Sequence, residues 1–334
     1  MDANAGSGGH FMHLLYLSRE DVEAVAPSMP EVIDILEIAF AEKGNGRTQM
    51  PPKMDLHPAA DCFIHSMPAF VPALGAAGVK WISGFPTNRE RDLPYITGLL
   101  ILNDPQTGLP VAVMDAAWIT AERTGAATAL AAKYLARTDA ASLAILGCGV
   151  QGRSNLKALR CVRPGLRKIR AYDLHAERAQ DYIKEMSRAF PGVEFLSASS
   201  PREAVDGADI VVTAGPIHTE PRPVIEAAWV KPGVFVCPLD YGSYVKPELF
   251  RKANKFLTDD TTQILDPRSA CYFPDMPPLY GDLGEVVAGL KPGRENDSER
   301  IVCANLGLAI DDVSVGIEIL KRARAAGRGT RLPL

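Results

Sequence analysis

The chain has 334 residues, of which 47% are hydrophobic and 23% are charged, and its formal net charge is −4. This composition is typical of a folded globular protein, and the length suggests about two domains. Lys and Arg form no block and no run of about 18 apolar residues occurs, so the composition argues against nucleic-acid binding, attachment to an anionic membrane and a membrane span.

The first residues, 1–11, are rich in Gly, Ser and Asn and lack the basic start and apolar stretch of a signal peptide. We expect them to be a leader or a tag, with Met12 as the natural start. The six cysteines are widely spaced and include no CxxC pair, so they are expected to be reduced core residues and not zinc ligands. Together these features predict a cytoplasmic protein.

The first regular element is predicted where Ser28 and Glu31 have the spacing of a capping box, with Pro30 in the first turn. Apolar residues then recur at helical spacing until Gly44, which predicts an amphipathic helix. From residue 62 to residue 115 the sequence changes to short runs of residues that favour β-strands.

Two of these runs, 99–102 and 111–114, flank an Asp-Pro pair and a Gly, which predicts a hairpin. The Ala-rich segment 116–136 then predicts a long helix. Further on, β runs alternate with helical stretches, and these runs are 142–146, 167–172, 209–213, 234–238 and 254–258. The alternation predicts an α/β fold, a doubly wound parallel sheet with helices on both faces. A last helix is expected from Asn305 to Ala326.

A glycine motif follows the first of these β runs and opens a helical stretch. It reads Gly147-Cys148-Gly149-Val150-Gln151-Gly152. The three glycines match the Rossmann fingerprint, in which they provide a tight turn, close approach of the backbone to a pyrophosphate, and close helix packing. The helix N-terminus then attracts the phosphate charge. The motif predicts a dinucleotide site, and the alternative is a glycine-rich turn that binds nothing.

The next β run ends at Asp173, where an acidic side chain can accept hydrogen bonds from the hydroxyls of the adenosine ribose. A carboxylate there repels a 2′-phosphate, which favours NAD over NADP. His175 and Arg178 follow closely and could weaken that preference. The alternative is that Asp173 only caps a helix.

Five segments in order resemble the ornithine cyclodeaminase/mu-crystallin family over essentially the whole chain from Met12. They are Val79-Lys80, the segment from Asp115 through Arg123-Thr124-Gly125-Ala126, the glycine motif, Trp229-Val230-Lys231-Pro232-Gly233, and Gly307-Leu308-Ala309-Ile310-Asp311-Asp312. The resemblance implies a homodimer with a Rossmann domain, residues 125–314, inserted into a second α/β domain for substrate binding and dimerisation, residues 1–124 plus 315–334.

The resemblance also implies an amino or imino acid as substrate, whose carboxylate must be held while the α-carbon faces the nicotinamide. Arg123 and Lys80 are the candidates, and Lys53 lies where the family often has a basic residue; Arg47 could compete for that role. From the residues alone, Arg123 could instead be a solvated helix residue and Lys80 the polar face of a half-exposed strand. We also expect Thr124 and Thr213 to contact the cofactor.

The acid/base group is predicted to be Asp240, which resembles the family's catalytic aspartate. The sequence after it is longer and more aromatic than in cyclodeaminases, so Asp240 could be displaced or only cap a helix. His65 stands where diamine-specific cyclodeaminases have a carboxylate, two residues before Met67, and both are predicted substrate-binding residues. A histidine is a poor partner for a terminal ammonium, although it could also be purely structural.

The leading hypothesis is therefore an NAD-dependent imino-acid reductase or amino-acid dehydrogenase in which Lys80 and Asp240 are catalytic and no metal takes part. The first alternative is an ornithine or lysine cyclodeaminase, which recycles NAD and releases ammonia. The second is a crystallin-like protein that binds the nucleotide without turnover.

Overall fold

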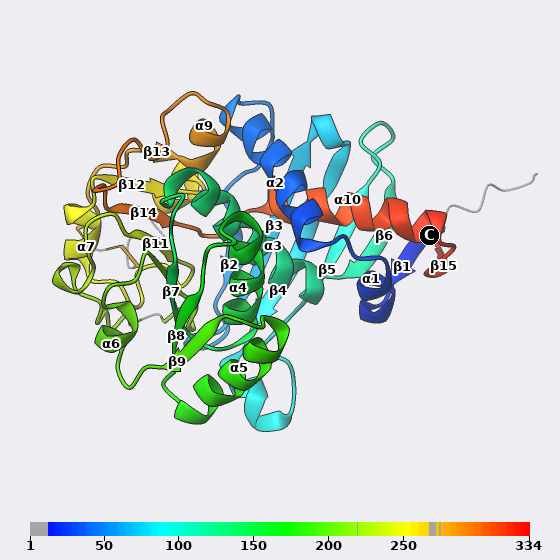
Figure 1. The fold of residues 1–334 in the computed structure, drawn as a ribbon. Helices are drawn as coiled ribbons and strands as arrows, with labels where there is room; N and C mark the ends of the chain where they lie inside the picture. Colours follow the sequence, from blue (N-terminus) through cyan, green and yellow to red (C-terminus); the bar gives the residue numbers. More distant parts are fainter. Residues whose placement is uncertain (1–12, 219, 267–271, 274) are drawn as a thin grey trace, which may run out of the picture.

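The computed structural model describes residues 13–218, 220–266, 272–273 and 275–334. Two β-sheets with their covering helices form two lobes that lie side by side (Figure 1). The expected leader and Cys271 lie outside the described residues. Within the described part of the chain, none of the helices combines the length and the apolar character that crossing a membrane requires.

The first lobe contains a seven-stranded sheet. In spatial order its strands are β15 (Thr330–Pro333), β1 (His13–Leu17), β6 (Pro110–Asp115), β5 (Ile96–Asn103), β4 (Ala76–Gly84), β3 (Phe63–Val71) and β2 (Met54–Leu56). The predicted hairpin is confirmed as the antiparallel pair β5 and β6. In β3 and β4, Met67 pairs with Lys80, and both side chains are buried.

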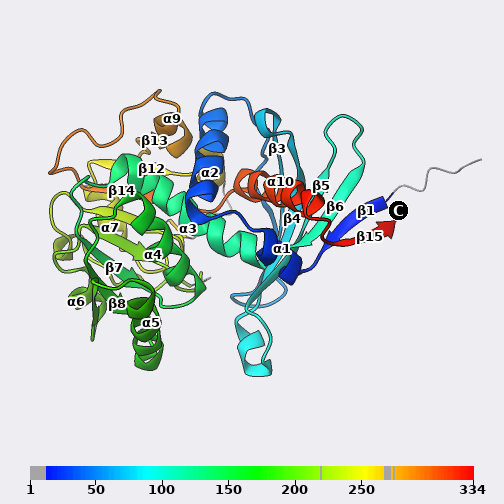
Figure 2. The ribbon, with the colours of Figure 1, turned by 45° about the vertical axis from the view of Figure 1, so that its right-hand side comes forward.

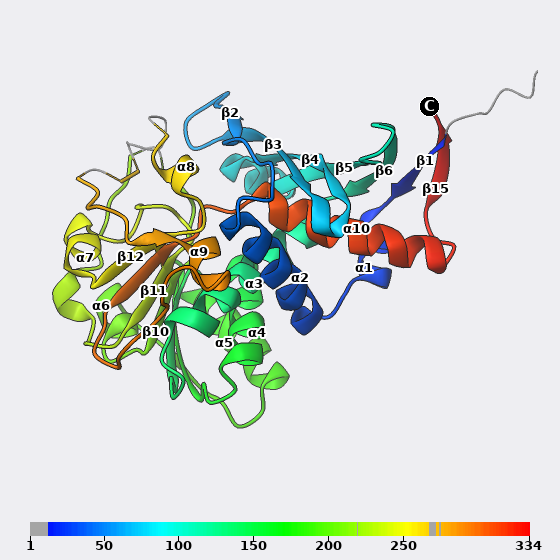
Figure 3. The ribbon, with the colours of Figure 1, turned by 90° about the horizontal axis from the view of Figure 1, so that it is seen from above.

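Helix α10 (Ala309–Ala325) covers one face of this sheet, α1 (Arg19–Val25) lies against β6, and α2 (Met29–Gly44) packs on α10. Short 3-10 helices, η1 (Pro72–Leu74) and η2 (Pro86–Arg91), follow β3 and β4. The capping box that was predicted to start α2 is confirmed, because the Ser28 backbone N–H donates to the Glu31 carboxylate at 2.7 Å. Helix α10 returns from the second lobe and packs along β3 and β4 (Figure 3).

The second lobe contains an eight-stranded sheet in which every neighbouring pair is parallel. Its strands in spatial order are β13 (Gly281–Asp282), β12 (Lys255–Thr258), β14 (Ile301–Ala304), β11 (Phe235–Pro238), β10 (Ile210–Thr213), β7 (Ser142–Leu146), β8 (Lys168–Tyr172) and β9 (Glu194–Ser197). The chain runs outward from β7 to β9 and then returns to β10 on the other side of β7. Ligands of such sheets bind outside the carboxyl ends of the strands at this reversal.

The helices of the second lobe are α4 (Val150–Val162), α5 (Ala176–Ala189), α6 (Pro201–Val205), α7 (Pro247–Lys252), α8 (Thr261–Ile264) and α9 (Leu283–Val287), with η3 (Ala227–Trp229). The predicted doubly wound parallel sheet is therefore confirmed. The five predicted β runs match β7, β8, β10, β11 and β12 to within one residue at either end.

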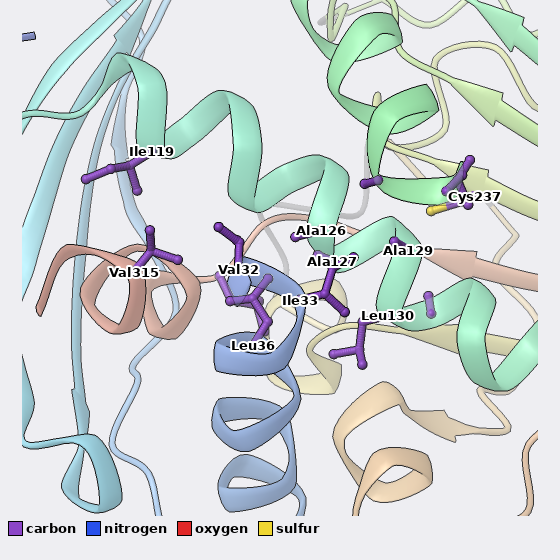
Figure 4. Close-up of a cluster of buried hydrophobic side chains, with 14 of the residues drawn as sticks. Val32, Ile33, Leu36, Ile119, Ala126, Ala127, Ala129, Leu130, Cys237 and Val315 are labelled. Atoms are coloured by element: carbon purple, nitrogen blue, oxygen red, sulfur yellow. The ribbon is translucent and has the colours of Figure 1, made fainter. Parts of the chain in front are cut away.

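Helix α3 (Ala117–Leu135) joins the two lobes (Figure 2). At its start Ile119 lies near Val315 of α10, and further along Ala127 and Leu130 pack against α2 (Figure 4). A Cβ on Gly125 would lie 2.3 Å from the Ser154 hydroxyl, so this glycine lets α3 and α4 approach closely. One continuous hydrophobic core therefore extends through both lobes.

Three expectations need correction. The last helix was predicted from Asn305, but α10 begins at Ala309, because Gly307 has a positive φ of 81° and Leu308 is extended. That helix was also expected to close the chain, whereas β15 follows it and pairs with β1. Cys161 is exposed, although all six cysteines were expected in the core; the other described cysteines are buried and unpaired.

Candidate active site

The glycine motif forms a tight turn between β7 and α4. Gly147 has a φ of 106°, and a Cβ there would lie 2.5 Å from the Ala214 carbonyl oxygen. A Cβ on Gly152 would lie 2.4 Å from the Gly147 carbonyl oxygen. The fold therefore requires glycine at both positions, because a left-handed backbone or a close backbone contact excludes a side chain.

Gly149 differs from these two glycines, because a Cβ there would meet no protein atom within 4 Å. It is the N-cap of α4, and no described side chain caps this helix. Val150, the first helical residue, is 64% exposed. Backbone N–H groups at an open helix N-terminus suit a pyrophosphate, so the turn fits the dinucleotide predicted from the sequence.

The carboxylate of Asp173 is fixed beside this turn. It accepts a hydrogen bond from the Cys148 backbone N–H at 2.9 Å and a second one from the His175 backbone N–H at 3.1 Å. His175, and not Asp173, is the N-cap of α5. The acidic group therefore stands at the carboxyl end of β8, adjacent to the glycine turn, where a ribose hydroxyl would be held.

Thr124 and Gln151 meet at one backbone carbonyl. The Thr124 hydroxyl donates to the Thr120 carbonyl oxygen at 2.8 Å, and the Gln151 amide approaches the same oxygen at 3.5 Å. This contact fixes the start of α4 against α3. The contact therefore joins the glycine motif to the part of α3 that carries Arg123.

Asp240 lies just beyond the carboxyl end of β11 and is completely buried. Its carboxylate accepts hydrogen bonds from the Thr213 hydroxyl at 2.8 Å and from the Gly215 backbone N–H at 3.2 Å. Burial raises the pKa of Asp240 to about 7, although both hydrogen bonds oppose the shift. The helix-cap alternative is wrong, because α7 begins only at Pro247. A carboxyl group with this pKa can exchange a proton near neutral pH.

A cluster of four buried charged residues lies where β4, α3 and α10 meet, and we call it the charged cluster; it comprises Lys80, Arg123, Asp311 and Asp312. Lys80 Nζ donates to Asp312 Oδ1 at 2.7 Å. Arg123 Nε lies 3.1 Å from the same Oδ1 atom, and Arg123 Nη1 donates to Asp311 at 3.3 Å.

Lys80 is completely buried and Arg123 is only 5% exposed. The alternatives of a half-exposed Lys80 and a solvated Arg123 are therefore wrong. Burial lowers the pKa of Lys80 to about 7, and Arg123 adds to this shift while Asp312 opposes it. A Cβ on Gly307 would lie 2.6 Å from Arg123 Nη1, so this glycine makes room for the guanidinium.

Lys53 connects the two lobes at the edge of the site. Its ammonium donates to the Tyr241 hydroxyl at 2.9 Å and to the Leu306 carbonyl oxygen at 2.8 Å. Tyr241 directly follows Asp240 and has a φ of 59°, a conformation that costs a residue with a side chain roughly 1–2 kcal/mol. Arg47, the competing candidate, instead pairs with Glu42 at the surface.

A hollow opens between the lobes beside Lys53. It is lined by the predicted residues Lys53 and His65 and by aromatic side chains that were not predicted to take part, among them Phe63, Tyr241 and Tyr272. His65 stacks on Phe63 with ring centroids 4.3 Å apart. Met67 is 4% exposed, belongs to the hydrophobic core and does not line this hollow, but it pairs directly with Lys80 across β3 and β4.

Three contributors were missed from the sequence. Asp311 and Asp312 stand in the quoted Gly307 to Asp312 segment but received no role, since acidic residues at a helix start usually only offset the helix dipole. Asp259 was not noticed; it is buried and accepts from the Gly307 backbone N–H at 2.7 Å. No group of three or more potential metal ligands occurs among the residues that the structure describes.

Comparison with known proteins gives one consistent assignment. Residues 13–327 match the sequence model of the ornithine cyclodeaminase/mu-crystallin family. An alanine dehydrogenase from Archaeoglobus fulgidus is 35% identical over 96% of this chain and 98% of its own length.

Two solved structures share the fold. The Thermococcus litoralis Δ1-pyrroline-2-carboxylate reductase, in complex with NADH and L-proline, is 33% identical, has a TM-score of 0.86, and is matched over 96% of this chain and 100% of its own. An archaeal alanine dehydrogenase dimer with bound NAD is 34% identical, has a TM-score of 0.88, and is matched over 97% and 100% of the two chains.

Proposed function

The chain belongs to the ornithine cyclodeaminase/mu-crystallin family, and from this premise we propose that it is an NAD-dependent oxidoreductase acting at the α-carbon of an amino or imino acid. The observation that carries the proposal is the pairing, in one chain, of an open glycine turn with the buried groups Asp240, Lys80 and Arg123. The archaeal alanine dehydrogenase with bound NAD and the Δ1-pyrroline-2-carboxylate reductase in complex with NADH and L-proline support this class of reaction.

Bound NAD would supply the hydride acceptor, and NADH the hydride donor. The backbone of the glycine turn would hold the pyrophosphate, and Asp173 would hold the adenosine ribose. Asp173 also favours NAD, because its charge repels the 2′-phosphate of NADP. Thr124 and Gln151, which meet at the Thr120 carbonyl oxygen, and the exposed Val150 would complete the proposed cofactor site.

Lys80 and Arg123 would bind the substrate carboxylate, since both carry the positive charge that it needs. Lys53, which precedes β2 in the same lobe as Lys80, can approach the same carboxylate, and its ammonium bridges to Tyr241 of the second lobe. Asp240 would give a proton to the imine nitrogen during reduction and take one from the ammonium during oxidation. Its pKa of about 7 makes both directions accessible near neutral pH.

The test is an assay of the purified protein, freed of bound nucleotide, with NAD and a panel of alanine, proline, ornithine and lysine. NADH formation and ammonia release are followed together. We expect NADH to accumulate, or to be consumed when pyruvate plus ammonia or a cyclic imine is supplied. Sustained ammonia release from a diamine without net NADH would instead establish the cyclodeaminase reaction.

We further propose that the protein is a homodimer that associates through the uncovered face of the first sheet. Trp81 on β4 and Leu99 on β5 are paired neighbours, and they remain 48% and 43% exposed. Adjacent exposed apolar residues of this size typically mark an interface. Light scattering should give twice the monomer mass, and Trp81→Glu should shift it to the monomer.

The cytoplasmic location stays a prediction. So does the division into domains at residues 124/125 and 314/315, which fall inside α3 and α10.

A further inference from the structure

Asp312 is the one residue of the charged cluster that contacts both of its cations. It lies in the first turn of α10 and is completely buried, and its Oδ1 atom lies 2.7 Å from Lys80 Nζ and 3.1 Å from Arg123 Nε. The three residues come from α10, β4 and α3, and Lys80 and Asp312 are 232 positions apart in the sequence. A contact of this kind forms only in the folded protein.

The ordinary role of an acid in the first turn of a helix belongs to the preceding residue. Asp311 accepts a hydrogen bond from the Leu308 backbone N–H at 3.3 Å and so satisfies the helix start. The described contacts of Asp312 are made to the side chains of Lys80 and Arg123 instead. Because the Asp312 carboxylate is buried away from solvent, stabilising the start of the helix does not by itself explain its position.

The surroundings of Lys80 show why this contact matters. Arg123 on α3 and Lys53 before β2 both add positive charge near the Lys80 ammonium, and burial removes its hydration. Asp312 is the carboxylate that opposes these effects by direct contact. Asp311 and Asp259 act on Arg123, and Asp311 does so through its ion pair with the guanidinium.

We propose that Asp312 is a positioning residue for the reaction: its carboxylate holds the Lys80 ammonium and the Arg123 guanidinium at one fixed separation, to which the substrate carboxylate binds. This inference rests on the proposed function. It assigns the returning helix α10 a part in substrate binding, although α10 contributes no group to the reacting atoms. It also predicts that Asp312 keeps Lys80 charged at the pH where the enzyme works.

The test compares Asp312→Asn with Asp312→Glu and with Asp260→Asn. Asp260 is a matched control, because it is 4% exposed and lies 3.4 Å from its own cation, Lys43, outside the charged cluster. Asn can still accept a hydrogen bond but cannot balance two cations. Without the carboxylate, Lys80 loses its proton at lower pH, by about one pH unit for the loss of one close opposite charge.

In Asp312→Asn we expect KM for the imino acid to rise about tenfold, and the alkaline limb of the pH profile for reduction to move about one unit toward acid. In Asp312→Glu the alkaline limb should lie at the same pH as in the unchanged protein, because the charge is kept. KM should stay raised, because the carboxylate is displaced. Asp260→Asn should lower the melting temperature without moving the limb. An identical pH limb and KM in Asp312→Asn and Asp260→Asn would overturn the proposal.

A second measurement is independent of turnover. The Lys80 ammonium can be titrated by NMR in protein labelled with carbon-13 at the lysine Cε, with Lys80→Met identifying its signal. A lower midpoint in Asp312→Asn than in the unchanged protein supports the positioning role, and equal midpoints contradict it. If the unchanged protein turns over no member of the substrate panel, the proposed function fails, and this titration still decides the role of Asp312.

Discussion

The glycine turn and the charged cluster would recognise their proposed ligands by different physical means. The turn is a short continuous segment, and it presents backbone N–H groups at an open helix end. The cluster collects side chains from β4, α3 and α10, all of them buried. In the proposed function, cofactor binding depends mainly on local backbone geometry, whereas the chemistry depends on charges whose pKa values are set by packing.

The largest effect is expected for Asp240→Asn. The amide cannot exchange the proton that the reaction requires, so turnover should fall by about 10²- to 10⁴-fold. NADH affinity, measured by fluorescence titration, should stay unchanged because the glycine turn is intact. A parallel loss of NADH affinity would show that the two regions are not separable.

The second effect concerns the glycine turn itself. Gly149→Ala adds a methyl group that meets no protein atom, so the fold should tolerate it, while NADH affinity should fall about tenfold, or roughly 1.4 kcal/mol. Gly147→Ala is the matched comparison. Its left-handed φ and its 2.5 Å contact should lower the free energy of unfolding by about 1–3 kcal/mol. Equal melting temperatures for the two variants would contradict this reading.

We expect the pH dependence of kcat/KM to follow the protonation of the buried Asp240 and Lys80 and not to depend on the glycine turn. Asp240 and Lys80 both have a pKa of about 7, the first raised and the second lowered by burial. Below this pH both are protonated, as imine reduction requires, so kcat/KM for reduction should fall as pH rises through about 7. Amino-acid oxidation needs ionised Asp240 and charged Lys80, so its profile should be bell-shaped. NADH affinity should vary little over the same range.

The smallest effect is expected for Asp173→Asn. The amide oxygen can still accept from the Cys148 N–H, but the charge that repels a 2′-phosphate is lost. The preference for NAD over NADP, as the ratio of the two kcat/KM values, should fall by about three- to tenfold. An unchanged ratio would show that neighbouring residues such as His175 and Arg178 set the preference.

Much of the fold could be predicted from the sequence, because its signals are local. The parallel strands appeared as apolar runs, and α2 as a capping box followed by helical spacing. The start of α10 was placed too early, since an apolar pattern does not reveal the left-handed turn at Gly307. Strand β15 was missed because it is exposed throughout and depends on pairing with β1.

The site was predicted in part. Lys80, Arg123 and Asp240 came from the resemblance, and the residues alone left a solvated Arg123 and a half-exposed Lys80 as alternatives. Their burial became visible only with the packing of α10 against β4. Met67, also predicted at the substrate, is buried in the hydrophobic core directly opposite Lys80, and its contact with the substrate stays a prediction.

The sequence alone determined the class of fold, the glycine turn and the family, because these depend on local patterns of neighbouring residues. The tertiary structure alone decided which carboxylates meet Lys80 and Arg123, and that Lys53 reaches across to Tyr241. The physical reason is that a buried charge takes its pKa and its partner from residues that are distant in the chain and adjacent only after folding.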